Sequence, residues 1–206
     1  MINILCFGDS NTYGYIPDGT GRYDENTRWT GLLQKKLGTQ YHIIEEGLCG
    51  RTTVFQDEFR PGRRGVESIG ILIESHNPID VLIIMLGTND CKTRYGACAG
   101  TIAKGIEQVM ERAQERINDT TKIVLVSPIL LKKGVGEKGY DVEFDEKSEA
   151  TSKALGKEYK QIAEKHNTNF LDASLVAEAS NVDREHLDAE GHKKLARAVY
   201  EKVLDF

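Results

Sequence analysis

The chain has 206 residues, of which 39% are hydrophobic, 29% charged and 7% aromatic, and its 27 basic and 32 acidic side chains give a net charge of −5. These values are typical of a soluble globular protein, and we expect one domain over residues 1–206. No basic stripe and no run of ~18 apolar residues occurs, which argues against nucleic acid and membranes as partners.

Strands and helices are predicted to alternate along the chain. Short continuous apolar runs predict strands, and apolar residues recurring every three or four positions predict helices. The strands are expected at Ile2–Phe7, Tyr41–Glu45, Val81–Leu86, Lys122–Ser127 and Asn169–Leu171, and the helices at Trp29–Leu37, Val66–Ser75, Thr101–Ile117, Ser148–His166 and Ala189–Leu204. Strands without polar alternation are buried on both faces, which predicts a three-layer α/β/α domain with a five-stranded parallel sheet.

The first strand runs directly into Gly8-Asp9-Ser10. Gly8 indicates a sharp exit from the strand, so Ser10 falls at a strand-to-helix turn, where free backbone N–H groups point at whatever lies above the hydroxyl. This placement suits a nucleophile for acyl transfer, although a serine in such a turn also serves as a plain helix cap. We expect Asp9 to fix the turn and to have no role as acid or base.

Two later turns carry groups that could bind an oxyanion. The second strand is followed by Gly47-Leu48-Cys49-Gly50, where a backbone N–H of Gly50 is a candidate donor, and the third by Gly87-Thr88-Asn89-Asp90, where the amide of Asn89 is another. Carboxyl ends of parallel strands share one edge of a sheet, so these groups are expected in one pocket. The alternative for each segment alone is an ordinary turn.

The fourth segment is Asp183-Arg184-Glu185-His186. A carboxylate three residues before an imidazole can orient it, which leaves the other ring nitrogen to act as base toward a serine. Taken alone, this spacing is more often a solvated turn. We interpret His192 as a helix-surface or packing residue, and His42, His76 and His166 as ordinary surface or capping histidines.

Together, these four segments resemble the blocks of the SGNH (GDSL-type) hydrolase superfamily, in which Ser, Gly, Asn and His occur in this order. Within it the chain is most similar to the arylesterase/acyltransferase branch, on the segments Ile4–Ser10, Arg28–Gly31, Ile44–Leu48, Arg51–Thr53 and Ile83–Asp90. The resemblance implies a flavodoxin-like strand order 2-1-3-4-5. Asn11 stands where the family commonly has Leu, and Tyr13 where the branch tends to have Trp.

The resemblance also implies a serine esterase for short-chain aryl or alkyl esters, working through an acyl-enzyme and with acyltransferase activity as an option. Ser10, His186 and Asp183 would form the catalytic triad, and Ser10, Gly50 and Asn89 the oxyanion hole. No cofactor and no metal is expected. We expect the loops Val54–Gly65 and Pro128–Lys147 to form the pocket walls, the second either as a lid or as a plain surface loop. In the resembling branch such loops meet neighbouring subunits, which implies a homo-oligomer. Arg28, Trp29 and Arg51 would support the site without catalysing.

Alternatives remain open at this point. Other enzymes of the superfamily are carbohydrate O-acetylesterases and lysophospholipase- or thioesterase-type hydrolases, and a different class is a flavodoxin-like binding module without catalysis. Against the module, no GxGxxG or P-loop sequence follows the first strand. The four cysteines form no CxxC pair, and the N-terminal apolar run is too short for a signal peptide, so we expect reduced thiols and a cytoplasmic location.

Overall fold

The computed structural model describes all 206 residues and contains one five-stranded sheet with the strand order β2-β1-β3-β4-β5. Every neighbouring pair of strands is parallel. The strands are β1 (Ile2–Gly8), β2 (Tyr41–Gly47), β3 (Val81–Met85), β4 (Lys122–Ser127) and β5 (Asn169–Asp172). The predicted strands, their orientation and their order are therefore confirmed, with shifts of at most two residues at their ends.

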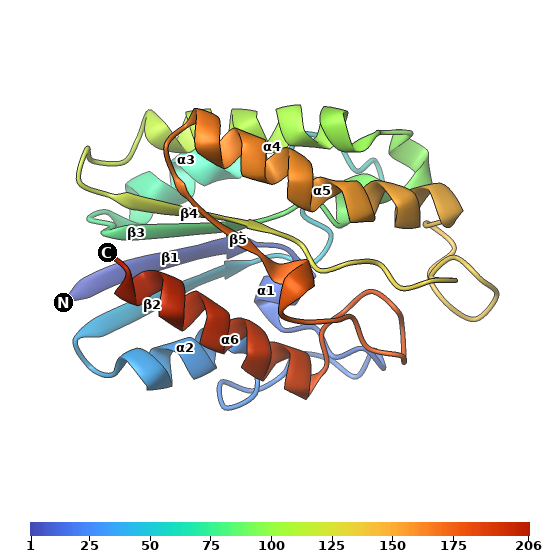
Figure 1. Cartoon of the computed structure of the whole chain (residues 1–206), viewed down its shortest axis with the longest axis horizontal. Helices are drawn as coiled ribbons and strands as arrows, with labels where there is room; N and C mark the ends of the chain where they lie inside the picture. Colours follow the sequence, from blue (N-terminus) through green and yellow to red (C-terminus); the bar gives the residue numbers. More distant parts are fainter.

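Helices cover both faces of this sheet (Figure 1). One layer holds α3 (Gly65–His76), α4 (Ala99–Gln114) and α5 (Glu146–Lys165), and the other holds α2 (Trp29–Leu37) and α6 (Ala189–Leu204). The predicted helices match except that α4 ends three residues earlier than expected. Ile117 still packs against the core, but from the turn that follows the helix, which is why its apolar spacing looked helical.

The central strands are apolar at nearly every position because the sheet separates two hydrophobic cores, one on each of its faces. In β1, Leu5 and Phe7 belong to the cluster under α3, α4 and α5, whereas Ile4 and Cys6 belong to the cluster under α2 and α6. All four side chains are at most 1% exposed. A strand buried on both faces has no polar alternation, as the sequence of β1 shows.

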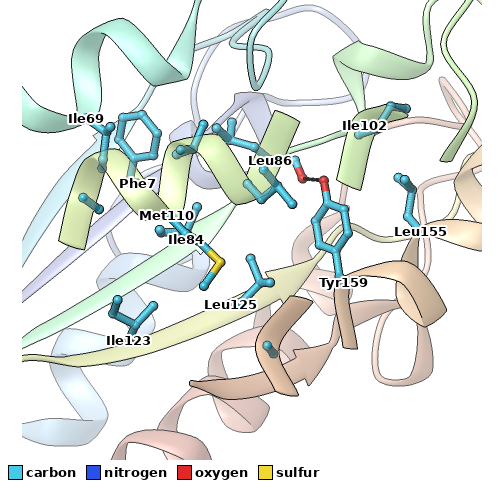
Figure 2. Close-up of a cluster of buried hydrophobic side chains, with 14 of the residues drawn as sticks. Phe7, Ile69, Ile84, Leu86, Ile102, Met110, Ile123, Leu125, Leu155 and Tyr159 are labelled. Atoms are coloured by element: carbon cyan, nitrogen blue, oxygen red, sulfur yellow. Dashed lines mark hydrogen bonds between the residues drawn. The ribbon is translucent and has the colours of Figure 1, made fainter. Parts of the chain in front are cut away.

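Figure 2 shows the larger cluster, in which one polar atom is buried among apolar side chains. The hydroxyl of Tyr159 on α5 donates a hydrogen bond to the backbone oxygen of Leu86 at 2.9 Å. Gly87 follows with φ +128°, and a Cβ there would lie 2.5 Å from the tyrosine oxygen. The close approach of Tyr159 therefore requires glycine at the point where the chain leaves β3.

Short helical elements follow the carboxyl ends of two strands. The four-residue helix α1 (Ser10–Tyr13) follows β1, and the 3₁₀ turn η1 (Asn89–Cys91) follows β3. Both chain termini lie at the opposite end of the sheet (Figure 1). None of the helices combines the length and the apolar character that crossing a bilayer demands.

Candidate active site

Ser10 is the first residue of α1, immediately beyond β1. Asp9 caps this helix, because its carboxylate accepts a hydrogen bond from the backbone N–H of Asn11 at 2.9 Å. Burial raises the pKa of Asp9 to about 7. The helix lies tightly against β2, where a Cβ on Gly47 would come within 2.1 Å of the backbone nitrogen of Tyr13. The backbone thus fixes the position of the Ser10 hydroxyl, as the Gly-Asp-Ser sequence predicts.

His186 comes from the distant loop before α6, and its ring connects Asp183 to Ser10. Its Nε2 lies 2.8 Å from the Ser10 Oγ, and its Nδ1 lies 2.6 Å from an Asp183 carboxylate oxygen. An ionised carboxylate only accepts hydrogen bonds, so Nδ1 carries the ring proton and Nε2 accepts from the serine hydroxyl. The other oxygen of Asp183 accepts from the backbone N–H groups of Glu185 and His186, which holds the loop in shape.

The imidazole of His186 is buried between acidic groups. Burial alone lowers the pKa of His186, but the negative charge of Glu185 and the hydrogen bond to Asp183 outweigh it and raise the pKa above its ordinary value. The Tyr15 ring lies 4.6 Å from the imidazole, centroid to centroid. In this environment the imidazole of His186 takes up a proton readily.

Gly50 and Asn89 lie beside Ser10 on the wall of the same cavity. Gly50 has φ +82°, a left-handed conformation that favours glycine, and its N–H donates to no other group of the protein. The Asn89 amide donates to the backbone oxygen of Arg51 at 3.1 Å, which orients the side chain and leaves its second N–H available. The N–H of Ser10, at the start of a helix, has no intrahelical partner.

Asp90 links the two loops that carry these donors, a contact that sequence reasoning missed. Its fully buried carboxylate accepts a hydrogen bond from the Thr53 backbone N–H at 2.9 Å and another from the Thr53 hydroxyl. Burial raises the pKa of Asp90 to about 6, although these hydrogen bonds work in the opposite direction. The turn after β3 is thereby tied to the segment that follows Gly50.

A cavity of about 780 Å³ opens above these residues. Phe59 and Arg60 of the loop Val54–Gly65 contribute to its wall, and so do residues of the segment Pro128–Lys147, as expected for both loops. Only five of its twenty lining residues are hydrophobic and eight are charged, so polar groups make up much of the lining. Its charged lining residues are Asp18, Arg60, Lys92, Arg94, Asp141, Glu143, Asp183 and Glu185. Most of these charged residues belong to no recognisable sequence motif, because they come from separate loops.

Of the residues expected to support the site, Arg51 contacts the end of the strand that leads to Ser10. Arg51 is buried, donates a hydrogen bond to the Gly8 backbone oxygen at 2.7 Å and lies over the Phe7 ring. Arg28 forms an ion pair with Glu45. None of Arg28, Trp29 and Arg51 lines the cavity, and neither do Asn11 and Tyr13, the two departures from the family pattern.

The expectation of a surface position for His192 is wrong, whereas its packing alternative is correct. Its side chain is completely buried, and Nδ1 accepts a hydrogen bond from the backbone N–H of Trp29 at 3.2 Å. Burial lowers the pKa of His192 to about 4. Of the other histidines, His42 is exposed, His76 contacts Glu46 and His166 ends α5.

One group of side chains has metal-ligand spacing. Glu107, Glu111 and His166 offer ligand atoms within 4.8 Å of one another, on α4 and at the end of α5, away from the cavity lining. Glu107 already contacts Lys165 at 2.7 Å and His166 at 2.8 Å, and these contacts lower the pKa of its carboxyl. Because the lysine already neutralises the carboxylate, we assign no metal to this group.

Comparison with known proteins points to the same family as the sequence motifs. Residues 6–194 match the GDSL-like Lipase/Acylhydrolase family. A solved carbohydrate acetylesterase family member from Sinorhizobium meliloti is 32% identical, with 98% of this chain and 97% of that chain covered and a TM-score of 0.92. The inhibitor-bound aryl esterase of M. smegmatis is also 32% identical, with 100% and 99% covered and a TM-score of 0.90. The comparison with curated proteins found no match.

Proposed function

The chain belongs to the GDSL-like lipase/acylhydrolase family, and from this membership we propose that it hydrolyses carboxylic esters with Ser10 as nucleophile, His186 as base and Asp183 as the group that orients the base. The observation that carries this proposal is the continuous chain of hydrogen bonds from Asp183 through His186 to Ser10, with lengths of 2.6 and 2.8 Å.

Each step of the reaction follows from these contacts. As Ser10 attacks the ester carbonyl, Nε2 of His186 takes the hydroxyl proton and then passes it to the departing alcohol oxygen. Asp183 keeps the ring in the required tautomer and stabilises the imidazolium. The N–H groups of Ser10 and Gly50 and the amide of Asn89 are the donors for the oxyanion, each typically worth about 3–4 kcal/mol of barrier. Water then attacks the acyl-enzyme by the same route in reverse.

The test is the variant Ser10→Ala. It should fold with an unchanged circular dichroism spectrum and lose at least about 10³-fold in turnover of p-nitrophenyl acetate. Ser68→Ala, on the half-buried face of α3, is the matched control and should retain full activity. A fluorophosphonate should label the wild-type protein at Ser10 and leave Ser10→Ala unlabelled. More than a tenth of the activity remaining in Ser10→Ala contradicts the assignment.

A carbohydrate O-acetylesterase is the second candidate, and the polar cavity favours it. Charged side chains from several loops line the cavity, which suits an alcohol moiety that bears hydroxyl groups better than an aryl or alkyl one. Relative kcat/KM values for acetylated sugars and for aryl acetates test this choice. Acyl transfer to alcohols needs an apolar pocket that restricts water, so the polar lining supports hydrolysis as the main reaction.

A homo-oligomer and a cytoplasmic location complete the proposal. Phe59 is 82% exposed and Val182 60% exposed, both at the cavity wall, and contact with a neighbouring subunit would remove both side chains from water. The four cysteines are all free, which suits a reducing compartment. Light scattering coupled to gel filtration tests the first point, because a monomeric mass contradicts it, and fractionation of the source cells tests the second.

A further inference from the structure

Glu185 is a buried carboxylate with no donor in the protein to bind. It lies between Asp183 and His186 in the catalytic loop, and its side chain is 8% exposed. It nevertheless lines the cavity. No N–H or O–H group donates a hydrogen bond to its carboxylate, and the Nε2 of His186, at 3.7 Å, is beyond hydrogen-bond range. Lys92, whose charge acts on Glu185, forms its own ion pair with Glu143.

Such a group is unfavourable unless something in the cavity binds it. Buried carboxylates are normally paired or hydrogen-bonded, because loss of hydration is costly. Burial indeed raises the pKa of Glu185. A carboxylate that lines the cavity is therefore placed to accept a hydrogen bond from the substrate.

The position of Glu185 shows which part of the substrate it would meet. The departing alcohol oxygen must come within about 2.6–3.2 Å of the His186 Nε2 to receive its proton. The Glu185 carboxylate lies 3.7 Å from that same nitrogen. The alcohol oxygen and the carboxylate thus share one neighbour, the Nε2 of His186, and a donor on the carbon next to that oxygen is placed to extend toward Glu185.

We propose that Glu185 accepts a hydrogen bond from a hydroxyl on the carbon next to the ester oxygen, so that the preferred substrates are monoesters of 1,2-diols, as in partly acylated sugars or glycerol. The proposal rests on the proposed esterase function and assigns the specificity of that site. A hydroxyl fits better than an ammonium group, because His186 becomes a cation 3.7 Å from Glu185 during the reaction. A second cation there would oppose its formation.

A matched pair of substrates isolates this contact. 2-Hydroxyethyl acetate has the hydroxyl, and 2-methoxyethyl acetate has nearly the same shape without the donor. After division by their hydroxide-catalysed rates, we expect the wild-type kcat/KM to favour the hydroxyl compound by about 10- to 150-fold, as for a hydrogen bond to a charged group. The ratio should fall to about 1 in Glu185→Leu and to an intermediate value in Glu185→Gln, which retains an acceptor.

Controls separate this contact from other effects of the charge. Glu58→Gln removes an exposed carboxylate from the loop Val54–Gly65 and should leave the ratio unchanged. If both Glu185 variants lower kcat/KM equally for the two acetates, the residue acts through His186 alone and the proposal is wrong. If Glu185→Leu does not fold, the ratio in Glu185→Gln decides, since an unchanged wild-type ratio there contradicts the proposal.

Two further measurements complete the test. Acetylcholine carries a quaternary ammonium in place of the hydroxyl, and a Glu185-dependent preference for it over 2-hydroxyethyl acetate would overturn the choice of a hydroxyl. Hydrolysis of p-nitrophenyl acetate, which has no such hydroxyl, should depend on Ser10 in every Glu185 variant. This keeps a failure of the diol preference distinct from a failure of the esterase assignment.

Discussion

The side-chain oxygen of Asn11 accepts a hydrogen bond from the backbone N–H of Leu187 at 2.9 Å. Asn11 directly follows Ser10, and Leu187 directly follows His186, so this bond joins the neighbours of two residues that are 176 positions apart. Both partners are buried, where a hydrogen bond is well shielded from water. Asn11 thus contacts the His186 loop and does not line the cavity, and we expect it to align that loop.

Replacement of Asn11 by Leu should therefore reduce catalysis as well as stability. The Leu187 N–H would be left buried without a partner, at a cost of about 1–3 kcal/mol in the free energy of unfolding. A small shift of His186 should lower kcat roughly 10-fold or more, with KM changed less than roughly threefold. Kinetics at a temperature where the variant is folded provide the measurement. The control Asn118→Leu, at an exposed site, should leave kcat unchanged. If Asn11→Leu loses stability but keeps the wild-type kcat, Asn11 has no aligning role.

Asn89→Ala should lose roughly 10²–10³-fold in kcat, because one of the three proposed oxyanion donors disappears. The bond to the Arg51 backbone oxygen also disappears, so a modest fall in melting temperature is expected. Steady-state kinetics with p-nitrophenyl acetate give the measurement. An unchanged kcat would show that Asn89 only closes a turn.

The pH dependence of kcat/KM should follow the protonation of His186. Only the neutral ring accepts the serine proton, so activity falls as the pH drops through the pKa of His186. Because Glu185 and Asp183 raise this pKa, the midpoint of the acid limb should lie above 6.5, the ordinary pKa of a histidine. Glu185→Gln removes the largest raising contribution and should move the midpoint to lower pH. A pH profile with p-nitrophenyl acetate tests both statements, and an unmoved midpoint in the variant refutes the second.

His192 should make the stability of the fold depend on pH. Its pKa is about 4 in the folded protein, whereas an unfolded chain restores the ordinary histidine value of 6.5, so the unfolded chain binds the proton more readily. The contribution is fully present above pH 6.5 and is lost as the pH falls toward 4. At about 1.4 kcal/mol per pKa unit it amounts to roughly 3 kcal/mol.

The variant His192→Asn isolates this effect, since its oxygen can replace Nδ1 as acceptor for the Trp29 N–H but does not titrate. Urea denaturation between about pH 7 and pH 4 should show a flatter decline than in the wild type, and kcat at about pH 8 should stay within a few-fold. His42→Asn, at an exposed site, is the matched control and should follow the wild type. Equal slopes for all three proteins would disprove the role of His192.

Short acyl chains should be hydrolysed far better than long ones. Eight of the twenty residues that line the cavity are charged, so a chain of twelve carbons would displace water from charged groups without replacing its hydrogen bonds. Each methylene that fits badly costs about 1–3 kcal/mol of discrimination. The measurement is kcat/KM for p-nitrophenyl esters from acetyl to lauroyl. A preference for the long chains would point to a lipase or lysophospholipase.

Local pattern in the sequence was sufficient for the strands and helices and for the candidate residues of the triad. Strands such as Val81–Met85 are apolar at every position because both faces are buried, and that requirement is visible in any single strand. Gly8, Ser10 and the Asp183–His186 spacing are likewise local, since turn geometry and the pairing of a carboxylate with an imidazole depend on nearby residues. Their resemblance to one family fixed the strand order, which no periodicity contains.

Only the tertiary structure determined what surrounds the proposed triad. The Asn11–Leu187 bond, the Asp90–Thr53 link and the unpaired carboxylate of Glu185 each depend on segments that are distant in sequence. The burial of His192 depends on how α6 packs against α2, because the same amphipathic helix has room for a histidine at its buried or its exposed edge. Helical periodicity specifies which side of a helix is apolar. The hydrogen-bond partner of each polar atom depends instead on which other element packs against it, and that is decided only in the folded protein.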